Sequence, residues 1–520
     1  MPLYYFLHKI PFLNDEPQFF AMIFENPILS TLSKNTTQIT TTYYQNTTHL
    51  AQYVDILKPI YATSLKKILI SEEHKQTLTE IGKIVLEALP LKNSTQIILK
   101  EILRKIDNLG DGSTGLILFC AILSRNLLGV VSKGVGRRQI SNSLKVIRRN
   151  ISKIEVDKVE LTFEDILDAR NFDKIASAIV KTKYLRDLVV EACANVFKNV
   201  QKKDFEKVLS EIDDRLRVVK VYSGLDSESQ LFKGLVYKNV AKTIVKEVET
   251  QRTSIYSCPI EISQTTSKGI VMFQTADELL SFSTEEEKNI KQTVEQLTKH
   301  SNVVVCSGKV ENLFLQYFDE KNVLVFNLNS KHDIRRIRNL FTGSVSPVLK
   351  ELNIENCGYC DFVKVLQFGN EKFTWFSNEK QNVATILLKN SIPQIADESE
   401  RLILKAMKAI EKNYINGKYT LVQGCGYFER KVASKLSEMP YEDEEPIYFD
   451  LVVEAFKKSL AELVCDIPSA ENVYDLLNVR LKVLQYAIDI CCTILETDDH
   501  FAVRDAMNLG QRPDMARDID

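Results

Sequence analysis

Apolar residues recur at helical spacing in two long blocks that lie near opposite ends of the chain. From about residue 48 to residue 153, stretches such as ILKEILRKI and STGLILFCAILS repeat apolar positions every three or four residues. A second block, from about residue 397 onward, includes RLILKAMKAIEKN, YFDLVVEAFKKSLAEL and VRLKVLQYAIDICCTIL. This spacing predicts two helical regions of similar character.

The segment between the two blocks has a different pattern. Short β-branched and aromatic runs alternate there with helical stretches such as ADELLSF and KVENLFLQYF, and the runs are IYSCPIEI, GIVMFQ, NVVVCSG, NVLVFNL and FTWFS. The alternation predicts an α/β module. We therefore expect an α+β multidomain fold, in which a helical domain built from both chain ends carries an inserted α/β module.

Composition excludes several functional classes. The chain has 67 Lys plus Arg and 69 Asp plus Glu, so no overall field draws it to nucleic acid or to a membrane surface. Ten cysteines are scattered without a framework, which favours a reducing compartment and a cytoplasmic location. We expect no signal peptide at the start, and no run of the roughly 20 apolar residues that a membrane span needs.

One glycine-rich turn carries the sharpest chemical signal. Gly110, Asp111, Gly112, Ser113 and Thr114 lie between a polar helix end and a long apolar helix. Glycines let the backbone approach phosphates, a helix start offers unpaired N–H groups, and the Asp111 carboxylate could hold Mg²⁺. On these residues alone an ordinary helix N-cap is the competing interpretation, since Asp, Gly and Ser all favour that position.

That turn resembles the Gly-Asp-Gly-Thr-Thr phosphate and magnesium loop of type II chaperonins, the eukaryotic cytosolic (TRiC/CCT) family. From Ile255, IYSCPIEISQTTSKGIVMFQTADELLSFSTEEE resembles an apical segment of the theta branch of that family. Further blocks occur in the same order at 302–310, 328–336 and 357–361, and near the C-terminal end. The resemblance covers most of the chain and is weakest before Lys66.

The resemblance implies three domains. A helical equatorial domain would comprise residues 1–152 and 393–520, an intermediate hinge domain 153–221 and 365–392, and an α/β apical domain 222–364. It also implies a hetero-oligomeric double ring of paralogous subunits that uses ATP and Mg²⁺ to enclose non-native client proteins. Neither nucleic acid nor membrane is an expected partner.

The sequence departs from the family where phosphate is held. The family's GPxGxxKM loop corresponds here to YATSLKKI at 61–68, in which only Lys67 remains. The family's LTNDGAT corresponds to LTEIGKI, which keeps Gly82 but puts Ile81 where a carboxylate would serve the metal and the attacking water. The family's GGGA loop is Gly424-Cys425-Gly426-Tyr427, with a bulky last residue.

A second family carboxylate is also replaced. Glu400-Arg401 is followed by Lys405, where the family has a water-activating aspartate. A lysine cannot polarise water as a carboxylate does, although its cation could pair with a phosphate or with Asp111. We therefore expect no catalytic residue and weak or absent ATP hydrolysis. Nucleotide, if bound, would meet Lys67, Gly82, Gly110, Asp111, Gly112, Ser113, Thr114, Gly424 and Gly426, with Asp111 as the metal ligand.

Two other functions remain open on the sequence. Glu80 could stand in for the carboxylate lost at Ile81, which would leave a working ATPase with substituted chemistry. Alternatively, the chain could be a free-standing helical scaffold outside any ring.

Client contact is the other predicted function. Lys309, Asn312, Leu313, Gln316 and Tyr317 fall at helical spacing on a segment that resembles the family's client-facing apical helix. In the competing interpretation, Leu313 and Tyr317 are core residues of the apical fold.

A basic cluster follows the predicted client helix. It consists of Lys331, Arg335 and Arg336. These side chains could meet acidic clients, or they could form an ordinary solvated surface.

Overall fold

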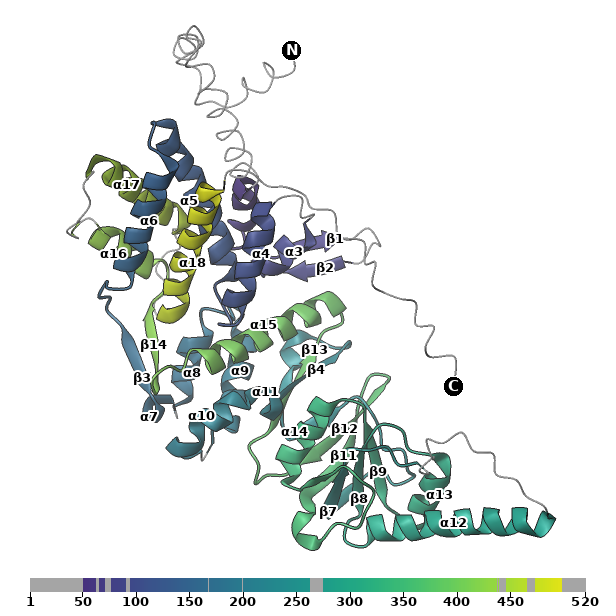
Figure 1. The fold of residues 1–520 in the computed structure, drawn as a ribbon. Coiled ribbons are helices and arrows are strands. Elements are labelled where there is room, and N and C mark those ends of the chain that lie inside the picture. The colour runs from purple at the N-terminus through teal and green to yellow at the C-terminus, as the bar shows by residue number, and fades with distance from the viewer. Residues whose placement is uncertain are drawn as a thin grey trace.

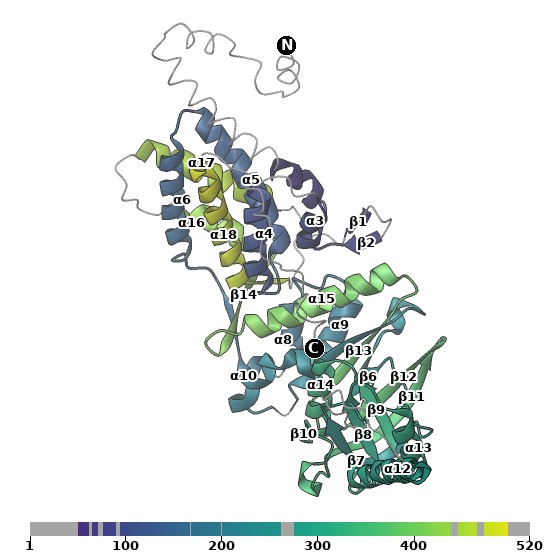
Figure 2. The ribbon, with the colours of Figure 1, turned by 45° about the vertical axis from the view of Figure 1, so that its right-hand side comes forward.

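A computed structural model describes most of the chain and places the elements in an elongated molecule (Figure 1). The described residues are 50–61, 65–70, 76–89, 94–166, 168–198, 200–261, 275–436, 438, 446–464 and 473–497. Figures 1 and 2 show a helical body at one end, a mixed middle body, and a sheet flanked by helices at the other end.

The helical body contains elements from both halves of the chain, as the periodicity predicts. Its helices are α3 (Gly82–Ala88), α4 (Ser94–Asp107), α5 (Ser113–Ser132), α6 (Arg137–Ile151), α16 (Tyr427–Leu436), α17 (Pro446–Leu463) and α18 (Leu477–Glu496). Helix α5 packs against α17, with the rings of Phe119 and Phe456 edge to face at 5.5 Å. An antiparallel hairpin of β1 (Lys67–Ile70) and β2 (Gln76–Thr79) lies beside the body, and Ile68 and Ile70 are exposed on it.

Helix α5 contradicts one expectation. Among the described residues it is the one helix long and apolar enough to cross a membrane, so the prediction that no such run exists is wrong. Within the fold, however, 67% of its apolar window is buried. Burial by neighbouring helices is typical of the core helix of a large domain, and the apolar character of α5 is explained by this packing.

The middle body joins short helices to a small sheet. Its helices are α7 (Phe163–Ile166), α8 (Ala169–Ala176), α9 (Lys183–Val196), α10 (Lys202–Ser210), α11 (Ile212–Arg215) and α15 (Pro393–Lys412). Its sheet has the order β4-β13-β5, formed by β4 (Leu216–Val221), β13 (Ala384–Lys389) and β5 (Gln230–Lys233). A second sheet, β15-β14-β3, is formed by β15 (Tyr474–Leu476), β14 (Lys418–Gln423) and β3 (Val159–Thr162). One continuous apolar core runs through the helical and middle bodies.

The sheet body has a seven-stranded sheet with helices on its faces. The strands are β6 (Leu235–Tyr237), β7 (Val248–Tyr256), β8 (Val303–Ser307), β9 (Leu324–Leu328), β10 (Val345–Ser346), β11 (Gly358–Phe368) and β12 (Glu371–Ser377). The helices are α12 (Ala276–Thr298), α13 (Asn312–Glu320) and α14 (Lys331–Phe341). The predicted runs NVVVCSG, NVLVFNL and FTWFS form β8, β9 and β12, whereas GIVMFQ lies outside the described residues.

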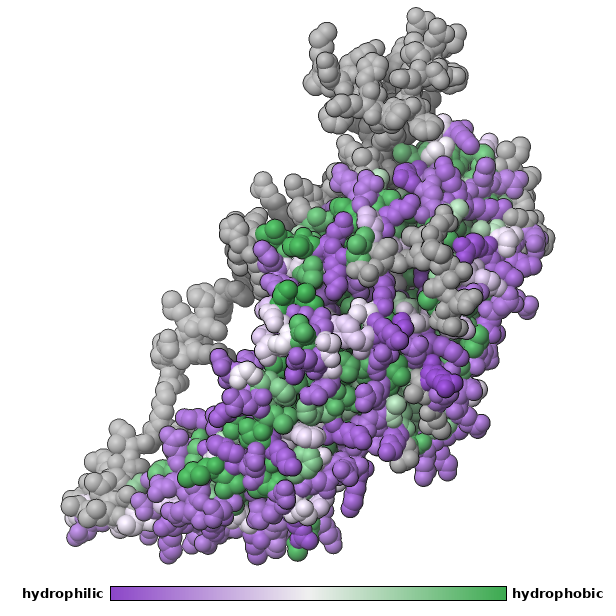
Figure 3. All heavy atoms as spheres, turned by 180° about the vertical axis from the view of Figure 1, so that it is seen from behind, coloured by the Kyte–Doolittle hydropathy of each residue, from purple (hydrophilic) through white to green (hydrophobic). Residues whose placement is uncertain are grey.

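The pairing of β11 with β12 shows where the sheet body ends along the chain. Strand β11 continues to Phe368 and pairs with β12, so this sheet extends beyond residue 364, where the sequence analysis divided the chain. Seen from behind, hydrophobic residues form several groups along the molecule with hydrophilic residues between them (Figure 3).

Candidate functional site

A cavity of about 290 Å³ lies between the helical body and the middle body. Its walls come from the start of α5, the segment before α3, helix α15, the start of α16 and the start of α18. The lining residues used below are Tyr61, Glu80, Ile81, Asp111, Gly112, Thr114, Gly115, Lys181, Arg186, Lys405, Gly426, Glu429, Val464, Val473, Asp475 and Arg480. The cavity therefore contains Asp111, the residue that sequence analysis predicted as a metal ligand.

The turn before α5 is shaped by close packing. Gly112 is the N-cap residue with φ 94°, in agreement with the N-cap interpretation, and no side chain caps the helix. A Cβ added to Gly112 would lie 2.8 Å from Val483, and one added to Gly110 would lie 2.3 Å from the backbone nitrogen of Ala409. Both glycines are therefore needed for contact with neighbouring helices, whatever else they contact.

Some predicted nucleotide-binding residues reach the cavity and others do not. Asp111, Gly112, Thr114 and Gly426 line it. The other predicted residues lie outside the lining: Lys67, Gly82, Gly110, Ser113 and Gly424.

Local packing accounts for three of these outlying positions. Lys67 lies on β1 opposite Thr79. The amide of Gly82 donates to Oγ1 of Thr114 at 2.9 Å, so Gly82 allows α3 to approach α5. Ser113 is fully buried, and its hydroxyl has no hydrogen-bond partner among the described residues. Of these three residues, Gly82 therefore supports the packing of α3 on α5, and Lys67 and Ser113 lie outside the cavity lining.

Asp111 is paired with a lysine. Nζ of Lys405, on α15, donates to Oδ1 of Asp111 at 2.7 Å, and the two side chains are 15% and 24% exposed. Burial opposes ionisation of Asp111, but the charge and hydrogen bond of Lys405 outweigh it and lower the pKa of the carboxyl group. Asp111 is therefore ionised and is already neutralised by the ammonium group of Lys405.

Arg480 organises a second charge cluster. Its guanidinium donates to the Tyr61 hydroxyl at 2.7 Å and lies 2.8 Å from Oδ2 of Asp475 and 3.4 Å from Oε1 of Glu429. Both carboxylates are buried, and burial raises the pKa of Glu429 and raises that of Tyr61 to about 12. Oε2 of Glu429 has no hydrogen-bond partner among the described residues. A phosphate placed in the cavity would also meet the Glu429 carboxyl group, which lines it.

The cavity carries no excess of positive charge. Four lining residues are cationic (Lys181, Arg186, Lys405 and Arg480) and four are acidic (Glu80, Asp111, Glu429 and Asp475). Burial also raises the pKa of Glu80, which indicates a carboxylate in a poorly solvated place. A triphosphate needs a surplus of cations or backbone donors to offset its charge.

The described residues do not fit a metal-bound triphosphate. A Mg²⁺ ion at Asp111 would have to displace Lys405, and Ile81, which lines the same cavity, offers no oxygen ligand. A Cβ on Gly426 would lie 2.7 Å from Val464, and one on Gly115 would lie 3.4 Å from the Tyr61 ring. Val464 therefore lies close to the backbone of Gly426, one of the predicted phosphate contacts, and the Tyr61 ring lies beside Gly115.

Sequence analysis missed a buried carboxylate that organises the segment before α3. Glu398, on α15, is fully buried and accepts hydrogen bonds from the Glu80 amide at 2.7 Å and the Thr79 hydroxyl at 3.2 Å. Arg401 pairs with Glu398 at 2.8 Å, whereas Glu400 pairs with Lys220 at 2.7 Å.

The Arg480 cluster was also missed. Its signal in the sequence is the pair Asp475 and Arg480 in the largely apolar run YDLLNVRLKVL, which also contains Asn478 and Lys482.

The five predicted client-binding residues lie on and just before α13. Lys309, Asn312 and Gln316 are exposed and Leu313 is 43% exposed, so Leu313 is not a core residue. Tyr317 is half-buried, packs on the apolar cluster beneath the helix, and lies 5.1 Å from Nζ of Lys291. The helix is anchored instead by Phe314 and Phe318, both buried.

Comparison with known proteins identifies the class to which this fold and cavity belong. The sequence pattern of the TCP-1/cpn60 chaperonin family matches residues 62–467. The chain therefore belongs to the TCP-1/cpn60 chaperonin family.

Within this family, the chain is similar to theta subunits. The chain is 30% identical to T-complex protein 1 subunit theta of Encephalitozoon cuniculi (strain GB-M1) over 460 residues, which cover 88% of this chain and 91% of the relative. It is 22% identical over 498 residues to the Caenorhabditis briggsae theta subunit, covering 86% and 88% of the two chains. It is 24% identical over 383 residues to the human theta subunit, covering 72% and 68%. Its similarity to theta subunits thus extends over most of its length.

Proposed function

We propose that this chain is a theta-type subunit of a cytosolic, hetero-oligomeric chaperonin double ring that assists ATP-dependent folding of client proteins. In this proposal the subunit builds the chamber and contacts clients, while paralogous subunits perform most of the ATP hydrolysis. The observation that carries it is the ion pair between Lys405 and Asp111, 2.7 Å long, where a metal ligand is expected. The family match and the theta relatives support ring membership.

We further propose a three-domain division. The helical body would be the equatorial domain, and the middle body would be the intermediate domain. The sheet body would be the apical domain and would extend to Ser377, because β12 is a strand of its sheet.

The chemistry of the cavity supports weak or absent hydrolysis. Phosphoryl transfer to water needs a metal ion on the phosphates and a carboxylate or comparable group to orient the water. Ile81 and Lys405 stand at the two expected carboxylate positions and both line the cavity. An apolar side chain and a cation supply neither function.

Total ATP hydrolysis by assembled rings tests the proposal. Rings carrying Asp111→Ala in this subunit alone should keep the wild-type rate, whereas the equivalent substitution in a hydrolysing paralogue should lower it. A large loss caused by Asp111→Ala would contradict the proposal. Recovery of this chain as an isolated monomer rather than in a ring-sized particle would instead favour the scaffold function.

A second candidate function follows from Glu80. This carboxylate lines the cavity next to Ile81, and its raised pKa would suit a proton acceptor. A subunit that hydrolyses ATP through Glu80 should lose its turnover in Glu80→Gln while still assembling into rings. Unchanged ring turnover in Glu80→Gln excludes this candidate.

A further inference from the structure

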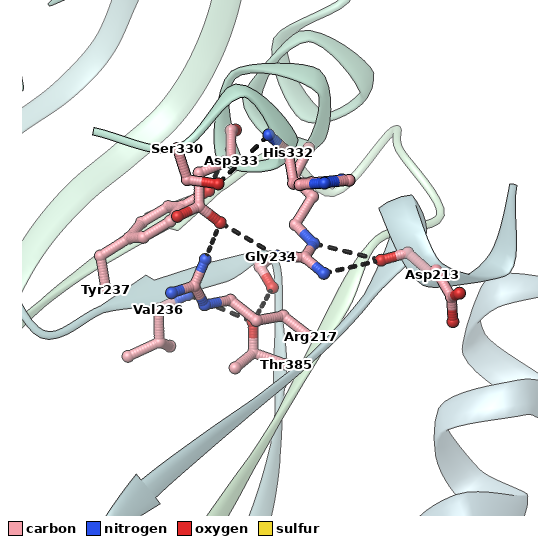
Figure 4. Close-up of polar contacts among 10 residues, drawn as sticks. Asp213, Arg217, Gly234, Val236, Tyr237, Ser330, His332, Asp333 and Thr385 are labelled. Atoms are coloured by element: carbon pink, nitrogen blue, oxygen red, sulfur yellow. Dashed lines mark hydrogen bonds and ion pairs between the residues drawn. The ribbon is translucent and has the colours of Figure 1, made fainter. Parts of the chain in front are cut away.

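The basic cluster on α14 makes contacts that sequence analysis did not predict. Arg336 does not face solvent freely, because its Nη1 donates to Oδ1 of Asp333 at 3.0 Å (Figure 4). The same carboxylate oxygen also accepts from Arg217. One aspartate therefore holds two guanidinium groups.

These residues come from two different bodies. Asp333 and Arg336 lie on α14 of the sheet body, whereas Arg217 is on β4 of the middle body. Nε and Nη2 of Arg336 donate to the backbone carbonyl oxygen of Asp213, on α11, at 3.1 and 3.0 Å. The hydrogen bonds drawn in Figure 4 thus bridge α14 to β4 and α11.

The bridge is well shielded from solvent. The side chains of Asp333, Arg217 and Arg336 are 15%, 20% and 23% exposed. The guanidinium of Arg217 also lies 4.2 Å from the centre of the Tyr237 ring, which is buried on β6. Charge pairs in this setting are screened less by salt than surface pairs are.

The chain crosses between the two bodies close to this bridge. One crossing is at Gly234, which has φ 112° and where an added Cβ would lie 2.1 Å from the carbonyl oxygen of Phe376. Oγ1 of Thr385 donates to the Gly234 carbonyl at 2.8 Å and accepts from the Val236 amide at 3.2 Å. The return crossing is the segment between β12 and β13.

Further contacts at the junction are an ion pair between Arg335 and Asp214 at 3.9 Å, a hydrogen bond from Nε1 of Trp375 to the Lys233 carbonyl at 3.0 Å, and a small apolar cluster. The cluster joins Val219, Val221 and Leu387 of the middle body to Val236 and Phe373 of the sheet body. Apolar contact is non-directional and tolerates sliding or rotation, whereas guanidinium–carboxylate bonds demand a defined geometry. The charged bridge has this directional geometry, and it is better shielded from solvent than the Arg335–Asp214 pair, in which the Arg335 side chain is 56% exposed.

We propose that Asp333, Arg217 and Arg336 form a latch that holds the sheet body in the orientation seen here, and that the latch opens whenever that body rotates about the two crossings. The latch is distinct from the cavity and does not depend on whether this subunit hydrolyses ATP. Removing the Asp333 charge would leave two adjacent guanidinium groups that repel each other, so the latch would open.

Hydrogen exchange of the full-length protein, in whatever assembly it occupies, tests the latch. Asp333→Asn should speed amide exchange at residues 212–217 and at Val236 by about tenfold, the effect of losing a partly buried charged hydrogen-bond pair. Amides of β8, inside the sheet body, should keep their rates, whereas general destabilisation would accelerate them too. The control Glu351→Gln breaks an ion pair with Lys299, 2.7 Å long, that lies within the sheet body, and should leave the junction unchanged.

A second pair of variants makes the result decisive. Arg217→Gln combined with Asp333→Asn should exchange no faster at the junction than Asp333→Asn alone, since both open one latch. If Asp333→Asn does not fold, Arg336→Gln replaces it and should accelerate exchange at residues 212–215 by about threefold. Wild-type exchange at the junction in the folded variants, or fully additive effects in the double variant, would overturn the proposal.

Discussion

Lys405 on α15 binds Asp111 in the turn before α5, joining two residues 294 positions apart in the chain. The ammonium group lies at the carboxylate that the family resemblance assigns to the metal. Sequence analysis left two partners open for this lysine, a phosphate or Asp111, and the structure has Asp111. An internal cation thus ties α15 to the turn before α5.

The Lys405 ion pair predicts a specific dependence of stability on pH. Because the folded pKa of Asp111 is lowered, the pair stabilises the protein above the ordinary aspartate pKa of about 3.9, and this contribution is lost as pH falls through the folded pKa. Lys405→Met should lower the free energy of unfolding by about 2 kcal/mol at pH 7. The difference from wild type should shrink as pH falls from about 4, the ordinary aspartate pKa, toward the lowered folded pKa at which Asp111 itself becomes protonated.

Urea unfolding followed by circular dichroism at several pH values measures this difference. Lys408→Met is the control, since Lys408 lies on the same helix, is 39% exposed and is 4.0 Å from Asp107. It should change stability by less than about 1 kcal/mol. A gap between Lys405→Met and wild type that stays constant from pH 7 to pH 3 would contradict this account.

Arg480 is predicted to be the most sensitive charge near the cavity. Arg480→Met would leave Glu429 and Asp475, which are 3% and 4% exposed, without their cation. Uncompensated buried carboxylates of this kind cost about 3–5 kcal/mol, and the variant should show a correspondingly lower unfolding midpoint. Arg125→Met, which breaks a more exposed pair with Glu462, should cost less than about 1 kcal/mol. Equal losses in the two variants would rule out a special role for the buried cluster.

Much of the fold follows from local pattern. The periodicity of ILKEILRKI and STGLILFCAILS predicts α4 and α5, and the β-branched runs predict β8 and β9. Periodicity specifies which face of an element is buried, but not which partner covers it. Contacts such as that between Arg480 and Tyr61, 419 residues apart, depend on tertiary packing and could not be predicted from the sequence. The replacement of two family carboxylates by Ile81 and Lys405 rests on the family resemblance and stays a prediction.

A comparison of Gly110, in the turn before α5, with Gly417 separates the energetic cost of close packing from that of backbone strain. Gly110 and Gly417 both have positive φ, 83° and 78°, but an added Cβ meets Ala409 backbone at Gly110 and nothing within 4 Å at Gly417. Gly417→Ala should cost about 1–2 kcal/mol through backbone strain alone. Gly110→Ala should cost at least about 2 kcal/mol more, because α15 must move. Equal thermal unfolding midpoints would show that the packing at Gly110 is unimportant.

Leu313 provides a test of client contact. Its side chain is 43% exposed on α13, so Leu313→Ser should leave the free energy of unfolding within about 0.5 kcal/mol of wild type. Capture of a chemically unfolded globular protein should weaken by about threefold, the effect of losing part of one leucine's apolar area. Leu404→Ser, on α15 with 45% exposure, is the control and should capture normally. Equal capture by both variants and the wild type would remove Leu313 from the client surface.

A density map of the assembled ring, prepared with ATP and Mg²⁺, tests the central claim most directly. The account predicts that Nζ of Lys405 stays on Asp111 in this subunit, at the 2.7 Å separation found here, while paralogous subunits hold metal and nucleotide. A metal-bridged triphosphate at Asp111, with Lys405 displaced, would contradict it.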